Sequence, residues 1–200
     1  MKKFFLIFFI FTISLVHSQS DVIKDNQDII SSIENNWNSI STMSGRFEQI
    51  DADNNIEYGN FYFEKPYKSK FSYDHKDETI ITNKILINVL DDEGYQIDSY
   101  PIGNSPIKNI LSNNIKFDDI FTITSVEQIF DKEEIYQITT INKDSENSEG
   151  KVLFFFTVDD LTLKKWAIFD EFGNRTVLEF TNMQKNISIG PNIFVVRYRH

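Results

Sequence analysis

The spacing of apolar residues changes once along this chain, near Gly45, and that change limits the folds it can adopt. Before this point apolar side chains recur every three or four residues, from Val22 through Ile33 and Trp37 to Ile40. Such spacing is typical of one face of an amphipathic helix. After it, apolar and polar residues alternate, as they do in strands. The sequence therefore predicts a helix of about five turns followed mainly by β-structure.

Short polar residues indicate where these elements begin and end. Ser20 and Asp21 suit the N-cap and first turn of a helix, so we expect the helix to begin there. Clusters of Asp, Asn and Gly separate the later apolar runs, as turns do. They divide the remaining chain into eleven expected strands, near residues 45–51, 56–64, 68–74, 78–82, 84–90, 94–99, 119–130, 133–141, 151–158, 161–170 and 174–184.

A second, short helix is expected between the sixth and seventh strands. Ser105 is a good N-cap, and Pro106 fits the first helical position because its missing N–H has no partner there. The apolar residues of this helix are Ile107, Ile110 and Leu111. The chain thus offers two helices that could cover a sheet.

The expected sheet has one apolar and one polar face. Phe61 and Phe63 share one face of the second strand, and Phe71 and Tyr73 share one face of the third with Ser69. Polar residues occupy most of the alternate positions. This pattern is typical of an antiparallel sheet that is covered on one side and solvated on the other. The predicted fold class is therefore mainly β with helices (α+β), in which a large curved antiparallel sheet has helices packed against its concave side.

The first segment has the features of a signal peptide. Two lysines precede an apolar stretch at 4–16, and the small residue Ser18 suits cleavage before the next residue. A membrane anchor is the alternative, but this stretch is shorter than the ~20 residues that a spanning helix needs. We expect residues 1–18 to be removed on export and 19–200 to form a single domain.

Composition argues against several classes of function. The net charge of −10 disfavours binding to nucleic acid, and the absence of Cys removes disulfides, thiol nucleophiles and Cys-based zinc sites. The sequence has no G-x-S-x-G, P-loop or H-E-x-x-H motif. The stretch from Asp51 resembles a calcium loop only at its start, because its sixth residue is Ile56 and its twelfth is Tyr62. We expect a hairpin turn there, with no metal, cofactor or catalytic residue in the chain.

Several stretches, taken in order, resemble the LolA family. They are Met43-Ser44-Gly45-Arg46-Phe47-Glu48-Gln49, Tyr58-Gly59-Asn60-Phe61-Tyr62-Phe63-Glu64-Lys65-Pro66 and Lys68-Ser69-Lys70-Phe71-Ser72-Tyr73. Ser105-Pro106 follows as the start of a lid helix, and Asp170-x-x-Gly173-Asn174-x-Thr176 as a hairpin typical of the family. The resemblance covers essentially the whole chain after the first segment. Relatives usually continue beyond Val196 into a further strand, where this sequence has Arg197-Tyr198-Arg199-His200.

The resemblance implies a fold and a function. The fold is an open, incomplete β-barrel whose hydrophobic cavity is closed by a helical lid. The function is a periplasmic chaperone and carrier that takes acylated lipoproteins from an inner-membrane ABC transporter (LolCDE-like) to an outer-membrane acceptor (LolB-like). LolB itself is membrane-anchored through a Cys, which this chain lacks, so we expect an unanchored, monomeric carrier with no enzymatic activity.

Eleven residues are candidates for lining a cavity that holds acyl chains, but each could equally be ordinary core. They are Ile33, Trp37, Ile40, Phe47, Phe61, Phe63, Phe71, Tyr73, Ile107, Ile110 and Leu111. Helices packed over a curved sheet either fill its interior or control access to it, and the sequence does not decide between these arrangements.

Lys65 is a candidate lid latch. The family usually has Arg before this proline, and the resemblance implies that its side chain reaches carbonyl groups of the lid helix and holds the empty carrier closed. Lys keeps the charge but lacks the planar guanidinium, so we expect a weaker or differently directed contact. The alternative is that Lys65 is an ordinary solvated residue at the rim of the sheet.

Two other functions remain open. One is a carrier of lipids or glycolipids, because an apolar cavity does not identify its cargo. The other is a sensor of the same fold that binds a membrane-bound anti-sigma factor and responds to stray lipoproteins. Such sensors usually carry a second domain, for which this chain has no room.

Overall fold

Eleven antiparallel strands form one sheet that does not close on itself. The computed structural model describes residues 14–103, 105–143, 150–170 and 172–199. The strands are β1 (Thr42–Ile50), β2 (Ile56–Glu64), β3 (Lys68–Tyr73), β4 (Thr79–Thr82), β5 (Leu86–Leu90), β6 (Gln96–Pro101), β7 (Phe121–Asp131), β8 (Glu133–Asn142), β9 (Lys151–Thr157), β10 (Leu163–Phe169) and β11 (Arg175–Lys185). The helices are α1 (Ser14–Asn38), α2 (Pro106–Ile110) and α3 (Phe117–Ile120). The predicted fold class is confirmed.

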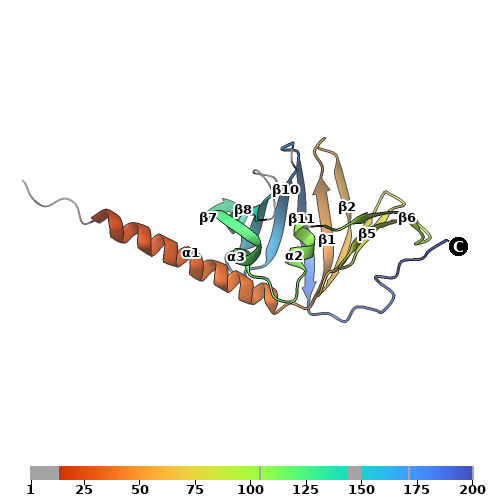
Figure 1. The fold of residues 1–200 in the computed structure, drawn as a ribbon, viewed down its shortest axis with the longest axis horizontal. Coiled ribbons are helices and arrows are strands. Elements are labelled where there is room, and N and C mark those ends of the chain that lie inside the picture. The colour runs from red at the N-terminus through yellow and green to blue at the C-terminus, as the bar shows by residue number, and fades with distance from the viewer. Residues whose placement is uncertain (1–13, 104, 144–149, 171, 200) are drawn as a thin grey trace, which may run out of the picture.

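The first and last strands of the chain lie side by side in the middle of the sheet. The order is β6-β5-β4-β3-β2-β1-β11-β10-β9-β8-β7, so β1 pairs with both β2 and β11. β6 and β7 are consecutive in sequence but stand at opposite ends of this order. The chain must therefore cross from one end of the sheet to the other after Pro101, and α2 and α3 lie in this connection (Figure 1).

Several predicted boundaries differ from the structure by a few residues. The first strand, for example, begins at Thr42 and not near residue 45. The long helix is already formed at Ser14, where the described residues begin, and does not start only at Ser20. Capping residues do not stop a helix, and no Pro or Gly interrupts this stretch. Figure 1 shows its N-terminal part reaching beyond the sheet. The seventh strand begins at Phe121 and not near 119, because Phe117–Ile120 forms α3. Most of the expected signal peptide, residues 1–13, lies outside the described residues.

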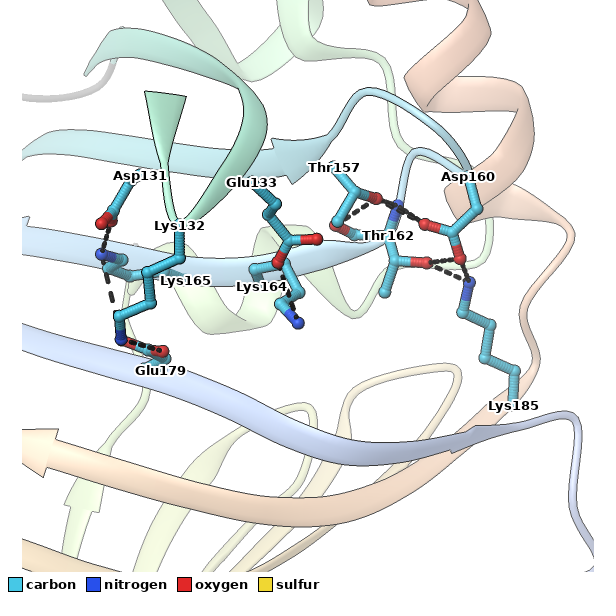
Figure 2. Close-up of polar contacts among 10 residues, drawn as sticks. All are labelled: Asp131, Lys132, Glu133, Thr157, Asp160, Thr162, Lys164, Lys165, Glu179 and Lys185. Carbon is cyan, nitrogen blue, oxygen red and sulfur yellow. Dashed lines mark hydrogen bonds and ion pairs between the residues drawn. The ribbon is translucent and has the colours of Figure 1, made fainter. Parts of the chain in front are cut away.

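The alternation of faces is as the sequence predicts. Phe61 and Phe63 of β2 and Phe71 of β3 are buried, whereas Asn60 and Lys68 on the opposite face are exposed. The covered side is called the inner face below. The outer face of β7 to β11 carries ion pairs instead, such as Lys165 with Asp131 at 2.8 Å between Nζ and Oδ2 (Figure 2). Exposed pairs of this kind contribute only ~0–1 kcal/mol each, so they keep this face soluble more than they stabilise it.

The turn at Asp51 is a hairpin, as predicted, and it has the same structure as the turn at Asp170. In each, the Asp carboxylate accepts hydrogen bonds from the backbone N–H and the side-chain amide of the Asn four residues later, at 2.8 to 2.9 Å. The residue before that Asn has a positive φ, 63° at Asn54 and 81° at Gly173. Asn and Gly tolerate this left-handed conformation best.

Candidate functional site

The eleven candidate residues come together in one apolar cluster on the inner face, which we call the inner cluster. Nine of them are buried and two, Tyr73 and Ile107, are partly buried. Helices and sheet contribute together, since Ile33 of α1 and Phe61 of β2 are both 0% exposed. In this structure the helices therefore lie directly on the sheet and cover it. Whether acyl chains replace these contacts stays a prediction.

Paired glycines and phenylalanines explain the two G-x-F motifs. Phe47 of β1 lies opposite Gly59 of β2, and Phe61 of β2 lies opposite Gly45 of β1. A Cβ atom on Gly59 would lie 2.6 Å from Cε1 of Phe47 and 2.2 Å from the carbonyl oxygen of Ser72. On Gly45 it would lie 2.9 Å from Cε1 of Phe61. Each glycine thus makes room for the ring on the neighbouring strand, which lets the two rings lie flat on the inner face.

The hydrogen bond of Lys65 goes to α1, whereas the expected partner was the short helix α2. Its Nζ atom donates a hydrogen bond to the carbonyl oxygen of Trp37, 2.6 Å away, in the last turn of α1. Burial lowers the pKa of the Lys65 ammonium to about 8. Helix carbonyls in the last turn have no partner within the helix and carry partial negative charge, which suits a cation. The side chain thus reaches from the end of β2 to a helix terminus.

Trp37 connects this contact to α2. Its indole Nε1 donates to the carbonyl oxygen of Ile110 at 2.9 Å. Next to it, the backbone N–H of Tyr67 donates to the carbonyl oxygen of Leu111 at 2.7 Å. These bonds are accepted at the C-terminal end of α2, where helix carbonyls need partners outside the helix. Lys65, Trp37 and α2 therefore form one chain of contacts from the sheet through α1 to the short helix.

Two further residues of α1 hold the segment after α2, and neither was predicted from the sequence. The Asn38 side chain accepts from the Ile115 N–H at 2.8 Å and donates to its carbonyl oxygen at 3.0 Å. Glu34 Oε1 accepts from the Phe117 N–H at 2.7 Å. Both lie off the apolar stripe of the helix and so resemble residues of a solvated face. The one general signal for them is that polar side chains near the end of a helix often form hydrogen bonds with backbone groups.

A third polar residue of α1 contacts the loop between β9 and β10. Asn36 Nδ2 donates to the carbonyl oxygens of Asp160 and Leu161, at 3.1 and 2.9 Å. The Asp160 carboxylate in turn accepts from Thr157 and Thr162 and lies near Lys185 (Figure 2). Burial raises the pKa of this carboxyl, but these hydrogen bonds and Lys185 outweigh burial and lower it to about 2.

A cavity of about 290 Å³ lies where α1 meets the end of the sheet. It is lined by α1 residues that include Ile30 and Glu34, by Asp118, and by β7 residues that include Ile123 and Val126. Ile30, Ile123 and Val126 belong to or pack against the inner cluster. This cavity therefore reaches the inner cluster from its margin.

Two kinds of feature are absent among the described residues, namely clusters of metal-ligating side chains and long apolar helices. No group of three or more His, Asp or Glu side chains among them could hold a metal ion. Within the described ranges, no helix combines the length and apolar character that a bilayer-spanning segment requires.

Comparison with known sequences identifies the family. The sequence model of the outer membrane lipoprotein carrier protein LolA matches residues 38–197, most of the chain. The chain belongs to the LolA family. LolA family proteins are periplasmic carriers that bind lipoproteins and are not enzymes. A search of curated protein sequences finds no match.

Three solved structures are similar to this chain at low sequence identity. An uncharacterized conserved protein from Thermus thermophilus is 8% identical, with a TM-score of 0.50, over 88% of this chain and 99% of that one. A LolA superfamily protein from Nitrosomonas europaea is 12% identical, with a TM-score of 0.44, over 83% and 97%. A putative outer membrane lipoprotein-sorting protein domain from Vibrio parahaemolyticus is 10% identical, with a TM-score of 0.49, over 84% and 94%. At such identities only the fold is comparable.

Proposed function

We propose that this chain carries acylated lipoproteins through the periplasm, from a LolCDE-like inner-membrane transporter to a LolB-like acceptor where one exists. Residues 1–18 are the export signal, and the mature protein begins at Gln19. The acyl chains bind at the inner face once α1 and α2 move away from it. The eleven candidate residues, which belong to or pack against the inner cluster, then line their site.

The arrangement of the inner cluster carries this proposal. Large apolar side chains cover the inner face of a sheet that does not close, and the parts that cover it include short helices in a connection between the two ends of that sheet. The short helices form no strand pairs with the sheet that they cover. Here a movement of α2 exposes apolar surface without breaking a strand pair. This is what a reversible site for acyl chains requires.

The size of the hydrophobic effect explains why a carrier is needed. A lipoprotein has three acyl chains of ~15 methylenes, and each buried CH₂ contributes ~0.8 kcal/mol. Exposing all of them to water would therefore cost tens of kcal/mol, and unassisted diffusion between membranes is excluded. A carrier must also release its cargo. Packing of its own helices on the inner face provides a competing set of contacts that favours release.

The test is release of a triacylated lipoprotein from spheroplasts by the purified protein. We expect the lipoprotein to appear in the soluble fraction in complex with the chain, and the de-acylated form not to bind. Release equal to buffer alone would contradict the carrier proposal. Equal binding of acylated and de-acylated forms would contradict the acyl-chain site.

Two measurements address the remaining parts of the proposal. N-terminal mass spectrometry of the protein from its own periplasm should give a chain that starts at Gln19. Lipid analysis of what co-purifies with it separates a lipoprotein carrier from a carrier of free lipids or glycolipids. Finding only a glycolipid there would favour the alternative cargo.

A further inference from the structure

The two tryptophans of this chain are both buried but differ in their hydrogen bonds. The indole N–H of Trp37 donates to Ile110, as described above. The Nε1 atom of Trp166 is buried as well, and no described residue accepts a hydrogen bond from it. Buried polar groups in proteins are nearly always paired, because an unpaired one has lost its bonds to water without replacement. Trp166 is therefore an exception that needs an explanation.

The chemistry of the indole group narrows the explanation. Its N–H can only donate, and its direction is fixed by the ring, so no rotation of a hydroxyl or exchange of amide atoms can satisfy it. The missing partner must be an acceptor. Trp166 lies on β10, 2% exposed, so this acceptor has to arrive inside the inner cluster.

The neighbours of Trp166 restrict the acceptor further. Its ring stacks on Phe63 at 6.2 Å between centroids and meets the edge of Phe180 at 4.9 Å. Both phenylalanines are buried members of the inner cluster. A charged acceptor such as a phosphate would lose its hydration among these aromatic rings. A neutral carbonyl attached to a long apolar chain fits, since the chain itself would be stabilised by the same aromatic rings.

We propose that the indole N–H of Trp166 donates a hydrogen bond to the acyl carbonyl of a bound lipid. This inference rests on the proposed function and adds the polar contact that positions the chain. An acylated lipoprotein has an ester or amide carbonyl at the head of each acyl chain. The hydrogen bond forms only in the loaded state, so it favours acyl chains over bare hydrocarbon. In the empty state the donor stays unpaired beneath the helices.

The experiment follows the two indole N–H signals by ¹⁵N NMR on the full chain, labelled at tryptophan. Trp37→Phe assigns the signals, since only two tryptophans are present. The probes are methyl palmitate and a straight-chain alkane of matched length. We expect methyl palmitate to move the indole N–H signal of Trp166 downfield, as a new hydrogen bond does. The alkane should not cause this downfield shift.

The outcomes separate this inference from the proposed function. If both probes bind but neither gives the downfield shift of Trp166, the acyl chain is carried and the proposed hydrogen bond is wrong. If neither probe changes either signal, the inner cluster takes up no acyl chain, which overturns the carrier proposal and this inference with it.

A matched pair of variants gives a second measurement. Trp166→Phe should lower the affinity for methyl palmitate about three- to tenfold, as loss of one hydrogen bond does, with little change for the alkane. Trp37→Phe should affect both probes alike, because it breaks a bond to α2 and not one to the ligand. Equal effects of Trp166→Phe on both probes would mean that this residue only fills space. Should Trp166→Phe fail to fold, the NMR measurement on the unaltered chain decides alone.

Discussion

Trp37 meets the Lys65 ammonium in two ways. Its carbonyl oxygen accepts a hydrogen bond from Nζ, and its indole ring centroid lies 4.7 Å from the same atom. The ring face carries negative charge density, so both contacts favour a cation at this position. A single lysine thus joins β2 to the last turn of α1, at the residue that also contacts α2.

This relationship predicts how Lys65 affects delivery of cargo. Lys65→Leu removes both contacts, so the closed, empty state loses stability relative to the loaded one. We expect uptake of lipoprotein to remain and hand-off to the acceptor to slow several-fold. Lys65→Arg should restore transfer, because the guanidinium offers more donors to the same carbonyl region. The measurement is the transfer rate from equal amounts of loaded carrier.

Lys68→Leu is the matched control for that prediction. Lys68 is close in sequence but exposed, and it forms an ion pair with Glu64. Its replacement should leave transfer unchanged. Equal transfer rates for the Lys65→Leu variant and the unaltered protein would show that Lys65 is a solvated residue at the rim.

The lowered pKa of Lys65 predicts a dependence on pH. The pKa is about 8 in the closed protein and near the ordinary 10.5 when the side chain is solvated. Between these two pH values, Lys65 takes up a proton when the protein opens. The closed form therefore gains stability as pH rises from about 8 to 10.5. Below this window Lys65 is protonated in both forms and contributes no pH dependence. The gain is at most about 1.4 kcal/mol per pH unit, and less for a half-buried group. Unfolding in urea across this window should show it as a difference between the unaltered chain and Lys65→Met. Identical pH profiles for the two proteins would contradict the lowered pKa of Lys65.

Ile110 distinguishes a lid from an ordinary core. It is 3% exposed on α2, and Ile138 of β8 is 0% exposed on the sheet. Each Ile→Ala change should lower the free energy of unfolding by ~2–5 kcal/mol. Only Ile110→Ala should also increase binding of an apolar fluorescent probe under native conditions, because it weakens the cover and not the sheet. Probe binding that rises equally in both variants would indicate general loosening instead.

Gly59 should be intolerant of any side chain. The close approach of Phe47 and of the Ser72 carbonyl leaves no space for a methyl group, so Gly59→Ala should destabilise the protein by ~1–3 kcal/mol or more. Gly190→Ala is the control, because a Cβ there meets nothing within 4 Å. Thermal unfolding of the two variants measures the difference. A neutral Gly59→Ala would show that the strands shift apart easily.

Asp160 predicts sensitivity to acid. Its pKa is about 2 in the folded protein, below the ordinary 3.8, so its stabilising effect is present above pH 4 and disappears as pH falls toward 2. Asp160→Asn should remove about 1 kcal/mol at neutral pH after allowance for solvent screening, and nothing near pH 2. Acid titration of both proteins by circular dichroism checks this. A constant difference at all pH values would mean that packing of the loop, and not charge, is responsible.

The sequence predicted the strands well because their apolar residues alternate without interruption. Phe61, Phe63 and Phe71 had to share one face whatever the order of the strands. The pairing of β1 with β11 could not be read from alternation, since it joins residues such as Phe47 and Phe180 that are distant in sequence. The family resemblance supplied the open sheet that periodicity alone left undefined.

Polar contacts of the site were harder to predict for a physical reason. Lys65 was identified, but its partner was expected on the short helix, and the structure places it on α1 at Trp37. Which carbonyl a flexible lysine reaches depends on how α1 and β2 cross, and this is decided by packing of the whole inner cluster. Asn38 and Glu34 were missed because their partners are backbone groups, which no side-chain pattern records.

The central position of β1 and β11 also determines when the chain can fold. β1 begins at Thr42 and its neighbour β11 ends at Lys185, so the middle of the sheet joins nearly opposite parts of the sequence. Closing so long a loop is slow. The central pair of strands therefore cannot form until β11 has been synthesised, and the complete sheet exists only after that point.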